Sequence, residues 1–377
     1  MQLKEVLTGV PLAVEIPAAL REAGITGLAY DSRKVAPGYL FFAFSGSKVD
    51  GAQFASAAVE KGAIGVVADR PQPSGFSAPW IQVSNGRRAL AIASRNFYGR
   101  PDERIAITAI TGTNGKTTTT SLIDSILRAS GKTTALIGTI EYRLAGNVLP
   151  AVNTTPESLD LFRMLHELEL ANGTHATLEA SSHALDLGRI YNMQMHTAGF
   201  TNLTRDHLDY HQTMEAYFTA KRLLFRPDEA PGWADLQRQG IAPGPPSYAI
   251  LNSDDEWIRK LDTAPGSELV WYGINQQPPA GSGLWVRAEN ISYSFDGLRF
   301  DVNTGERRFP IESKLVGRIN VYNVLLAAAT AFTYGLTEEQ IQKGIAQLPC
   351  VPGRFERVEG GQPFLVVVDY AHTDDAL

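Results

Sequence analysis

A glycine-rich segment, standing between an apolar strand-like run and a helix-like run, carries the clearest chemistry in the chain. It reads Thr111-Gly112-Thr113-Asn114-Gly115-Lys116-Thr117-Thr118. Glycines let backbone N–H groups approach phosphate oxygens, and the N-terminus of the next helix favours their negative charge. Lys116 then reaches the β- and γ-phosphates, and the Thr117 hydroxyl ligates Mg²⁺. The segment predicts a nucleotide site. An ordinary glycine turn is the alternative, because Ile110 replaces the first glycine of the general P-loop pattern.

A second segment places a carboxylate after an apolar run. It reads Leu178-Glu179-Ala180-Ser181-Ser182-His183. Ligands of open α/β sheets bind beyond the carboxyl ends of the strands, so Glu179 is placed to face the phosphates and hold a metal ion. A capped turn without chemistry is the alternative here.

A third segment runs from Asn202 to His211 and precedes a helix that carries Lys221. His207 and His211 are four residues apart, a spacing that can bind zinc on one helix face. A zinc hydrolase signature has a glutamate between its histidines, and this segment has none. Taken singly, each histidine is expected to be a structural hydrogen-bonding residue, and Lys221 a solvated helix lysine.

The elements that must position these residues alternate along the chain, which predicts an α/β fold. We expect an N-terminal domain over residues 1–100, a central domain with a mainly parallel sheet over 101–349, and the start of a third domain over 350–377. The sequences Arg100–Glu103 and Pro349–Pro352 predict the two linkers. Expected strands cover Tyr39–Phe44, Ile64–Ala68, Ile105–Ile110, Thr134–Ile137, Ala176–Ala180, Ala198–Leu203 and Phe364–Asp369, with a hairpin over 285–303. Expected helices cover Phe54–Lys61, a stretch after Lys116 that stops at Gly131, a stretch capped by Thr155 with Pro156 first, and Asn320–Tyr334.

The amino-acid composition and net charge argue against some classes of function. The 377 residues are 44% hydrophobic and 20% charged, as in ordinary globular proteins. A net charge of −6 argues against a nucleic-acid binder that relies on a general basic field. The sequence has neither a secretory signal nor an apolar run long enough to insert stably in a membrane. With Cys350 as its one cysteine, it fits a reducing cytoplasm, and we expect a cytoplasmic monomer.

Taken in order, the motifs resemble the Mur ligase family, over essentially the whole chain. The segments that carry the resemblance are Asp31-Ser32-Arg33, Gly112–Thr118, Asn153-Thr154-Thr155-Pro156, Glu179–His183, Asp206–His211, Gly317-Arg318-Ile319-Asn320 and Asp369-Tyr370-Ala371-His372-Thr373. The resemblance implies a UDP-binding N-terminal α/β domain, a central P-loop domain and a truncated C-terminal Rossmann-like domain. It is strongest to members that use ATP to add a diamino acid, meso-diaminopimelate or L-lysine, to UDP-MurNAc-L-Ala-D-Glu through an acyl phosphate in peptidoglycan synthesis.

The resemblance also implies roles for individual residues. ATP is bound by Gly112–Thr118, with Asn320, Asp369 and His372 near its base and ribose. Two Mg²⁺ ions are held by Thr117, Glu179, His207 and a carbamate that CO₂ forms on Lys221. Lys116, Lys221, Glu179 and His207 are the implied catalytic residues. The UDP part is bound by Tyr30, Ser32, Ser47, Lys48 and Val49, and the muramoyl-dipeptide part by Asn153, Thr154, Thr155, Ser181 and Arg189.

Two positions depart from the family pattern. Leu187 stands where the family often has a glutamine, which puts one substrate contact in doubt, and Asp374 stands where it usually has proline. The domain that selects the incoming amino acid is expected to lie beyond this chain. The alternatives are a folylpolyglutamate or cyanophycin synthetase, a non-catalytic nucleotide-binding scaffold, and a motor or switch NTPase with Glu179 as its acidic strand residue.

Overall fold

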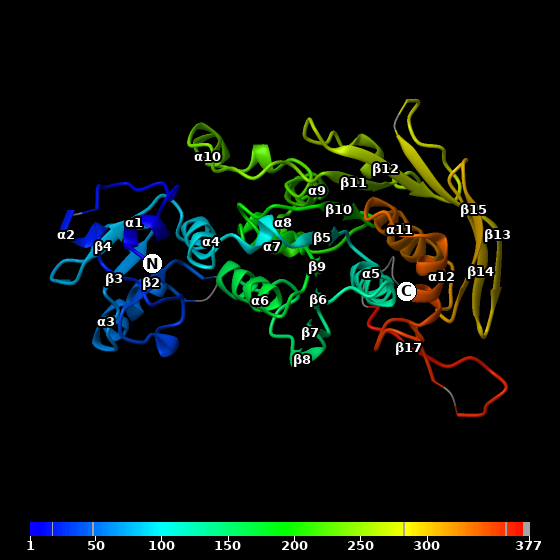
Figure 1. Ribbon diagram of the computed structural model, residues 1–377, viewed down its shortest axis with the longest axis horizontal. Helices are drawn as coiled ribbons and strands as arrows, with labels where there is room; N and C mark the ends of the chain where they lie inside the picture. Colours follow the sequence, from blue (N-terminus) through cyan, green and yellow to red (C-terminus); the bar gives the residue numbers. More distant parts are fainter. Residues whose placement is uncertain (17, 47–48, 282, 359, 372–377) are drawn as a thin grey trace.

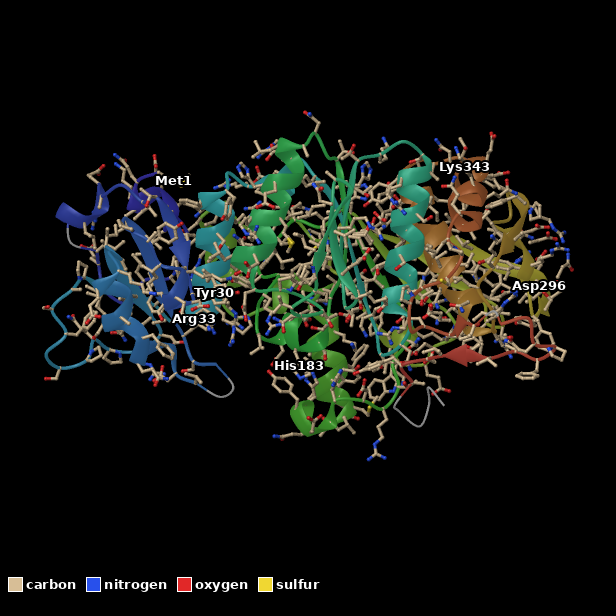
Figure 2. All side chains as sticks on the ribbon, turned by 90° about the horizontal axis from the view of Figure 1, so that it is seen from below. Met1, Tyr30, Arg33, His183, Asp296 and Lys343 are labelled. Atoms are coloured by element: carbon tan, nitrogen blue, oxygen red, sulfur yellow. The ribbon has the colours of Figure 1, made fainter. Side chains whose placement is uncertain are left out.

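Two β-sheets with flanking helices make up most of the molecule in the computed structural model, which describes residues 1–16, 18–46, 49–281, 283–358 and 360–371. The N-terminal sheet lies at one end and the larger central sheet fills the rest (Figure 1). Asp296, in the hairpin at the far edge of the central sheet, lies at the opposite end of the molecule from Met1 (Figure 2).

The N-terminal sheet has four parallel strands in the order β1-β2-β3-β4. Most residues of β1, β2 and β3 are buried and apolar, as expected for strands of a parallel sheet covered on both faces, whereas in β4 only Ile81 is buried. Its elements are α1 Leu3–Val6, α2 Ala18–Arg21, β1 Gly27–Ala29, η1 Ser32–Lys34, β2 Tyr39–Ala43, η2 Gly51–Phe54, α3 Ala55–Glu60, β3 Gly65–Ala68, β4 Trp80–Gln82 and α4 Gly86–Phe97.

The central sheet has eleven strands in the order β15-β14-β13-β12-β11-β10-β5-β9-β6-β7-β8. The seven from β13 to β6 run parallel, and an antiparallel pair extends each edge. The strands are β5 Ala106–Thr111, β6 Thr134–Ile137, β7 Glu141–Leu144, β8 Asn147–Pro150, β9 His175–Glu179, β10 Thr197–Phe200, β11 Tyr248–Asn252, β12 Glu268–Gly273, β13 Leu284–Ser294, β14 Gly297–Asn303 and β15 Arg308–Ser313; a two-stranded ribbon follows, β16 Glu356–Arg357 with β17 Val367–Val368.

Helices cover both faces of the central sheet. Apolar residues of α5, α11 and α12 share one core cluster, and those of α6 and α9 share another, so β5 is enclosed from both sides. None of the helices in the described part of the chain has the length and apolarity needed to cross a membrane. The helices are η3 Pro101–Glu103, α5 Lys116–Ala129, α6 Ser158–Leu170, α7 Ser182–Asp186, α8 Leu208–His211, α9 Met214–Arg222, η4 Pro227–Glu229, α10 Trp233–Arg238, η5 Ile258–Lys260, α11 Ile319–Thr333 and α12 Glu338–Ala346.

The α/β fold, the mainly parallel central sheet and the hairpin over 285–303 are confirmed. The predicted start of the helix after Thr154 is wrong, because α6 begins at Ser158 with Glu157 as its N-cap. Thr155 does not cap a helix: its hydroxyl donates to the Glu179 carbonyl at 2.7 Å and accepts from the Ser181 N–H at 3.1 Å. The strand predicted over 364–369 is reduced to the two residues of β17.

The first predicted linker is a packed junction. Its residues form the 3₁₀ helix η3, and Asp102 is 2% exposed and ion-paired with Arg95 of α4 at 2.8 Å. The core beside the N-terminal sheet also takes in residues from further along the chain, namely Leu159, Tyr191, Trp233 and Leu236. The two sheets are therefore joined by shared apolar packing as well as by the chain.

Candidate nucleotide and substrate site

The glycine-rich segment forms a tight loop between β5 and α5. Gly112 has a φ of +143°, and a Cβ there would stand 1.8 Å from the Thr201 hydroxyl oxygen. Gly115 has a φ of +86° as N-cap of α5, with no room for a side chain against Asn323. Only glycine fits either position, so the loop keeps its backbone N–H groups at the N-terminus of a 14-residue helix. This is the geometry of a phosphate-binding loop.

Two lysines converge on one carbonyl oxygen of this loop. The Nζ atoms of Lys116 and Lys221 each donate to the Gly112 oxygen at 2.8 Å. Burial lowers the pKa of Lys116, and it lowers the pKa of Lys221 further with the help of the neighbouring Lys116 charge. Lys221, at 1% exposure, is therefore not the solvated lysine that it would be if read in isolation.

Glu179 lies at the carboxyl end of β9, next to the phosphate loop. Its Oε2 accepts from the Thr117 hydroxyl at 3.1 Å, and its Oε1 accepts from the Thr139 N–H at 2.8 Å. A cavity of about 180 Å³ opens beside Thr117 and Glu179 and reaches the segment around Cys350. This places a carboxylate and a hydroxyl, two oxygen ligands that Mg²⁺ accepts, at the edge of a space beside the loop.

His207 lies at the rim of the same region. It adopts a left-handed φ of +52° just before α8, and its side chain is 43% exposed. Partial burial lowers the pKa of its imidazole, while Asp206 opposes this shift. Its ring centroid is 4.9 Å from that of His183, and 6.1 Å from that of Tyr217 beside Lys221. The structure thus brings His207 to the neighbourhood of the loop lysines.

The residues assigned to the muramoyl-dipeptide form one cluster beyond the ends of β9 and β6. Thr154 and Thr139 have their hydroxyl oxygens 3.1 Å apart, and Thr139 in turn bonds to Glu179. Arg189 donates to the Thr155 carbonyl at 2.9 Å, and the Thr155 hydroxyl bonds to Ser181. Asn153 is held by its backbone to the Tyr142 hydroxyl.

The residues assigned to the UDP part lie beside the N-terminal sheet. Tyr30 stands where this sheet meets the central part of the molecule (Figure 2), and its hydroxyl donates to Asp160 of α6 at 2.5 Å. Ser32 begins η1, and Val49 is 48% exposed. Ser47 and Lys48 lie outside the described residues.

Asn320 is connected to the loop region through Asn323, whereas the recorded contacts of Asp369 are with the backbone near it. Asn320 is 3% exposed and accepts from Asn323, which accepts in turn from the Thr119 hydroxyl of α5. Asp369 accepts from the Phe355 N–H and, at 2.7 Å, from the Ala371 N–H. His372 lies outside the described residues.

Comparisons with known proteins agree with this geometry. A family model for the Mur ligase middle domain matches residues 110–331, and one for the Mur ligase family catalytic domain matches residues 24–98. A UDP-N-acetylmuramoyl-L-alanyl-D-glutamate–2,6-diaminopimelate ligase of Solibacter usitatus is 55% identical over 377 residues, 100% of this chain and 72% of that protein. The ligase of the same name from Geobacillus kaustophilus is 44% identical over 356 residues, 94% of this chain and 69% of that protein.

The chain belongs to the Mur ligase family. A solved structure of a UDP-N-acetylmuramoyl-L-alanyl-D-glutamate–2,6-diaminopimelate ligase superposes with a TM-score of 0.79 at 28% identity. The superposition covers 100% of this chain and 72% of the chain in the solved structure. Both expectations drawn from the motif order, the family and its fold, are confirmed.

This Mur ligase positions its phosphate loop with residues that the sequence did not single out. The Asn202 side chain accepts from the Asn114 N–H at 2.9 Å and donates to the Asn114 carbonyl at 3.1 Å. Asn323 supports Gly115, and Arg354 lies near enough to Lys116 to act on its pKa. Asn202 belongs to the segment that follows an apolar strand, so its place in the sequence could have indicated that it contacts the loop. No local sequence pattern indicates that Asn323 or Arg354 lies near the loop.

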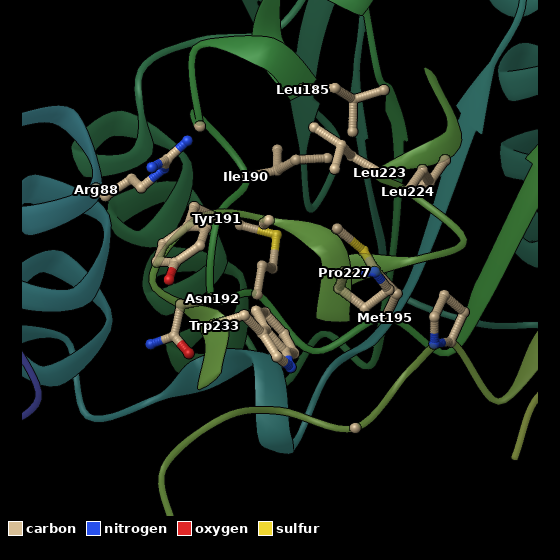
Figure 3. A pocket seen from close by; sticks show the side chains of 15 residues that line it. Arg88, Leu185, Ile190, Tyr191, Asn192, Met195, Leu223, Leu224, Pro227 and Trp233 are labelled. Carbon is tan, nitrogen blue, oxygen red and sulfur yellow. The ribbon is translucent and has the colours of Figure 1, made fainter. Parts of the chain in front are cut away.

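A separate apolar pocket of the Mur ligase lies away from this loop. It has a volume of about 50 Å³ and is lined among others by Arg88, Tyr191, Asn192 and Trp233 (Figure 3). That is less than a cavity of ~150 Å³ that holds a benzene ring. It is too small for a nucleotide sugar, so the candidate site stays at the phosphate loop.

Proposed function

We propose that this Mur ligase joins 2,6-diaminopimelate to UDP-N-acetylmuramoyl-L-alanyl-D-glutamate with ATP, in peptidoglycan synthesis. The observation that carries the proposal is the meeting of Lys116 and Lys221 at the Gly112 carbonyl, with Glu179 beside Thr117. Lys116 and the backbone N–H groups of residues 112–118 can neutralise a polyphosphate next to a cluster suited to a peptide carboxylate. The relatives named above support diaminopimelate as the added amino acid over L-lysine.

The reaction proposed begins with carboxylate activation. An oxygen of the D-glutamyl side-chain carboxylate attacks the γ-phosphorus of ATP, and the bond to the bridging oxygen breaks to release ADP. The amine of diaminopimelate then attacks the acyl carbon, phosphate leaves with the C–O electron pair, and the amine loses a proton. Carboxylate and ATP are both anionic, so Lys116 and the N–H groups of residues 112–118 stabilise the transferring phosphoryl group.

The residues present suit magnesium. Mg²⁺ in nucleotide sites takes one or two protein carboxylates together with phosphate oxygens and water. Glu179 and Thr117 already bond to each other beside the loop, and His207 lies at its rim. Among the described residues, no group of three or more His, Cys, Asp and Glu side chains is placed to hold a metal ion. Mg²⁺ bound by these residues would supply positive charge that stabilises the transferring phosphoryl group.

Lys221 suits carbamylation by CO₂. Its amine is buried and its pKa is lowered well below the ordinary value, which favours the neutral, nucleophilic form. Among the described residues, no carboxylate forms an ion pair with it. The amine nitrogen would bond to the carbon of CO₂ and lose a proton, leaving a carboxylate-like group that can join Glu179, His207 and Thr117 as a metal ligand.

Substrate roles follow the two clusters. Tyr30, Ser32 and the Ser47-Lys48-Val49 loop hold the uridine diphosphate. Asn153, Thr154, Thr155, Ser181 and Arg189 hold the muramoyl dipeptide. Asn320, Asp369 and His372 are assigned to the base and ribose of ATP. We further propose domain boundaries near residues 100 and 349 and a cytoplasmic, monomeric enzyme.

Calorimetric titration and product analysis test the proposal together. The chain should bind both ADP and UDP-MurNAc-L-Ala-D-Glu. A protein that carries this chain and has the full length of the relatives, of which the chain covers 72% and 69%, should release ADP and form the UDP-linked tripeptide with Mg²⁺-ATP and diaminopimelate. UDP-MurNAc-L-Ala, which lacks the D-glutamyl carboxylate, is the matched control and should release no ADP above background. A chain that binds neither nucleotide nor nucleotide sugar, or that binds folate instead, would contradict the proposal.

A further inference from the structure

The first turn of α6 carries two carboxylates that contact groups of the N-terminal sheet region. Glu157, the N-cap of α6, has a side chain that is 10% exposed. Its Oε1 is 3.4 Å from Nε of Arg87, which belongs to α4, and 3.1 Å from Nε of Arg189, which follows α7. Asp160, three residues later in the same turn, accepts from the Tyr30 hydroxyl at 2.5 Å. One short turn thus bridges the two sheets.

Arg87 connects this turn to the loop proposed for the UDP part. Its guanidinium lies over the Phe44 ring, 4.7 Å from the centroid, and its Nη1 donates to the Ser45 carbonyl at 3.2 Å. Phe44 also stacks on Tyr30, with ring centroids 6.3 Å apart. Ser45 comes two residues before Ser47 in the sequence, so Arg87 contacts the chain just before the residues proposed for the UDP part.

Arg189 connects the same carboxylate to the dipeptide cluster. Its Nη1 donates to the Thr155 carbonyl at 2.9 Å, and the Thr155 hydroxyl donates to the Glu179 carbonyl. Glu157 therefore stands between the two groups of residues that were assigned to opposite ends of one substrate.

Glu157 contacts more positive groups than one carboxylate can balance. Its Oε1 faces two guanidiniums, whose side chains are 16% and 18% exposed. Glu157 Oε2 is buried and has no hydrogen-bond partner among the described residues. Leaving a buried polar atom unpaired costs free energy, so this arrangement is poorly explained by stability alone. A net positive pair between two subsites suits an anionic substrate that spans them.

We propose that Glu157 is a positioning residue that sets Arg87 and Arg189 relative to each other, and thereby fixes the spacing between the UDP subsite and the dipeptide subsite. It acts through the two arginines and does not touch the substrate. This inference rests on the proposed function. In it, the first turn of α6 sets the distance between the two subsites to match the length of the nucleotide-sugar peptide.

The Glu157→Gln variant of the same chain tests this role, because it keeps the shape and removes the charge. We expect its affinity for UDP-MurNAc-L-Ala-D-Glu to fall by roughly 10-fold or more, on the scale of a lost charged hydrogen bond. Its affinities for UDP alone and for ADP should change by less than about 2-fold, since each ligand occupies one subsite only. Titration calorimetry measures the affinity of the variant and of the unmodified chain for each of the three ligands.

Glu169→Gln is the matched control, because Glu169 lies on the same helix and also pairs with an arginine, Arg104. It should leave all three affinities unchanged. Unchanged substrate affinity in Glu157→Gln, or equal losses for UDP, ADP and the whole substrate, would overturn the positioning role. If the unmodified chain fails to bind UDP-MurNAc-L-Ala-D-Glu, the proposed function itself falls, and the inference falls with it.

Discussion

At Gly112, one carbonyl oxygen accepts a hydrogen bond from each of two buried lysines. A carbonyl can satisfy two donors, but it cannot balance two positive charges in a buried site. Burial therefore lowers the pKa of both amines, and the charge of Lys116 lowers that of Lys221 further. A neutral Lys221 is both cheaper to bury and reactive toward CO₂.

Lys221→Ala is accordingly expected to lower tripeptide formation by about 100-fold, the scale found when one group that stabilises a transition state is removed. Added acetate or formate should restore part of the activity by supplying the missing carboxylate. Lys343→Ala, which removes an exposed lysine of α12, is the control and should behave like the unmodified chain. Near-normal activity of Lys221→Ala with no effect of carboxylates would contradict the carbamate.

At the scale of elements, the sequence predicted best where local rules decide. Strands β5 and β9 and helix α5 were predicted because apolar runs, glycine turns and helical spacing are all local signals. The candidate site residues at their ends were predicted from the same local signals. The start of α6 was missed because Thr155 bonds to Glu179 and Ser181, which are more than 20 residues away. The Thr155 hydroxyl makes these tertiary hydrogen bonds instead of capping the helix.

The residues that hold the site residues in place could not be predicted, because their contacts are with residues far away along the chain. Asn323 reaches the phosphate loop from α11, about 200 residues along the chain, and no spacing rule connects the two. The same holds for Glu157, whose two arginine partners come from segments before and after it along the chain. Sequence motifs predict groups that contact ligands, and packing determines which residues hold them.

His175, at the start of β9, gives this element a pH dependence. Burial first, and then the charges of Lys132 and His196, lower the pKa of His175 from 6.5 to about 4. Between these values the unfolded chain binds a proton that the folded chain does not. The contribution of the neutral His175 side chain to stability is therefore fully present above about pH 6.5, and it is lost as the pH falls toward 4.

Urea unfolding of His175→Gln should show this directly. Between pH 6.5 and pH 4.5, the unmodified chain should lose on the order of 2 kcal/mol more unfolding free energy than the variant does. His166→Gln, which removes a half-exposed histidine, should keep the pH dependence of the unmodified chain. Parallel pH profiles for His175→Gln and the unmodified chain would show that His175 carries no such shift.

At the scale of the whole molecule, the two sheets are joined by a buried junction. Arg95 and Asp102 are 3% and 0% exposed at their side chains, and Asp102 also accepts from the Gln194 N–H at 2.8 Å. This pair ties α4 to η3 and to the segment before β10. The relative positions of the UDP and dipeptide clusters depend on this junction as well as on the first turn of α6.

Asp102→Asn should lower the free energy of unfolding by about 3 kcal/mol, because it leaves the Arg95 charge buried beside a neutral group. Glu103→Gln, at the half-exposed second partner of Arg95, should cost less than ~1 kcal/mol. Denaturant titration of both variants measures the difference. Equal, small losses in the two variants would mean that the buried pair does not hold the junction.

The central claim is that the γ-phosphoryl group of ATP passes to the D-glutamyl carboxylate at the loop of residues 112–118. It is tested most directly by labelling that carboxylate with ¹⁸O and analysing the released phosphate by mass spectrometry. The account predicts that one labelled oxygen appears in the phosphate for each tripeptide formed. Tripeptide accompanied by phosphate without label would contradict it.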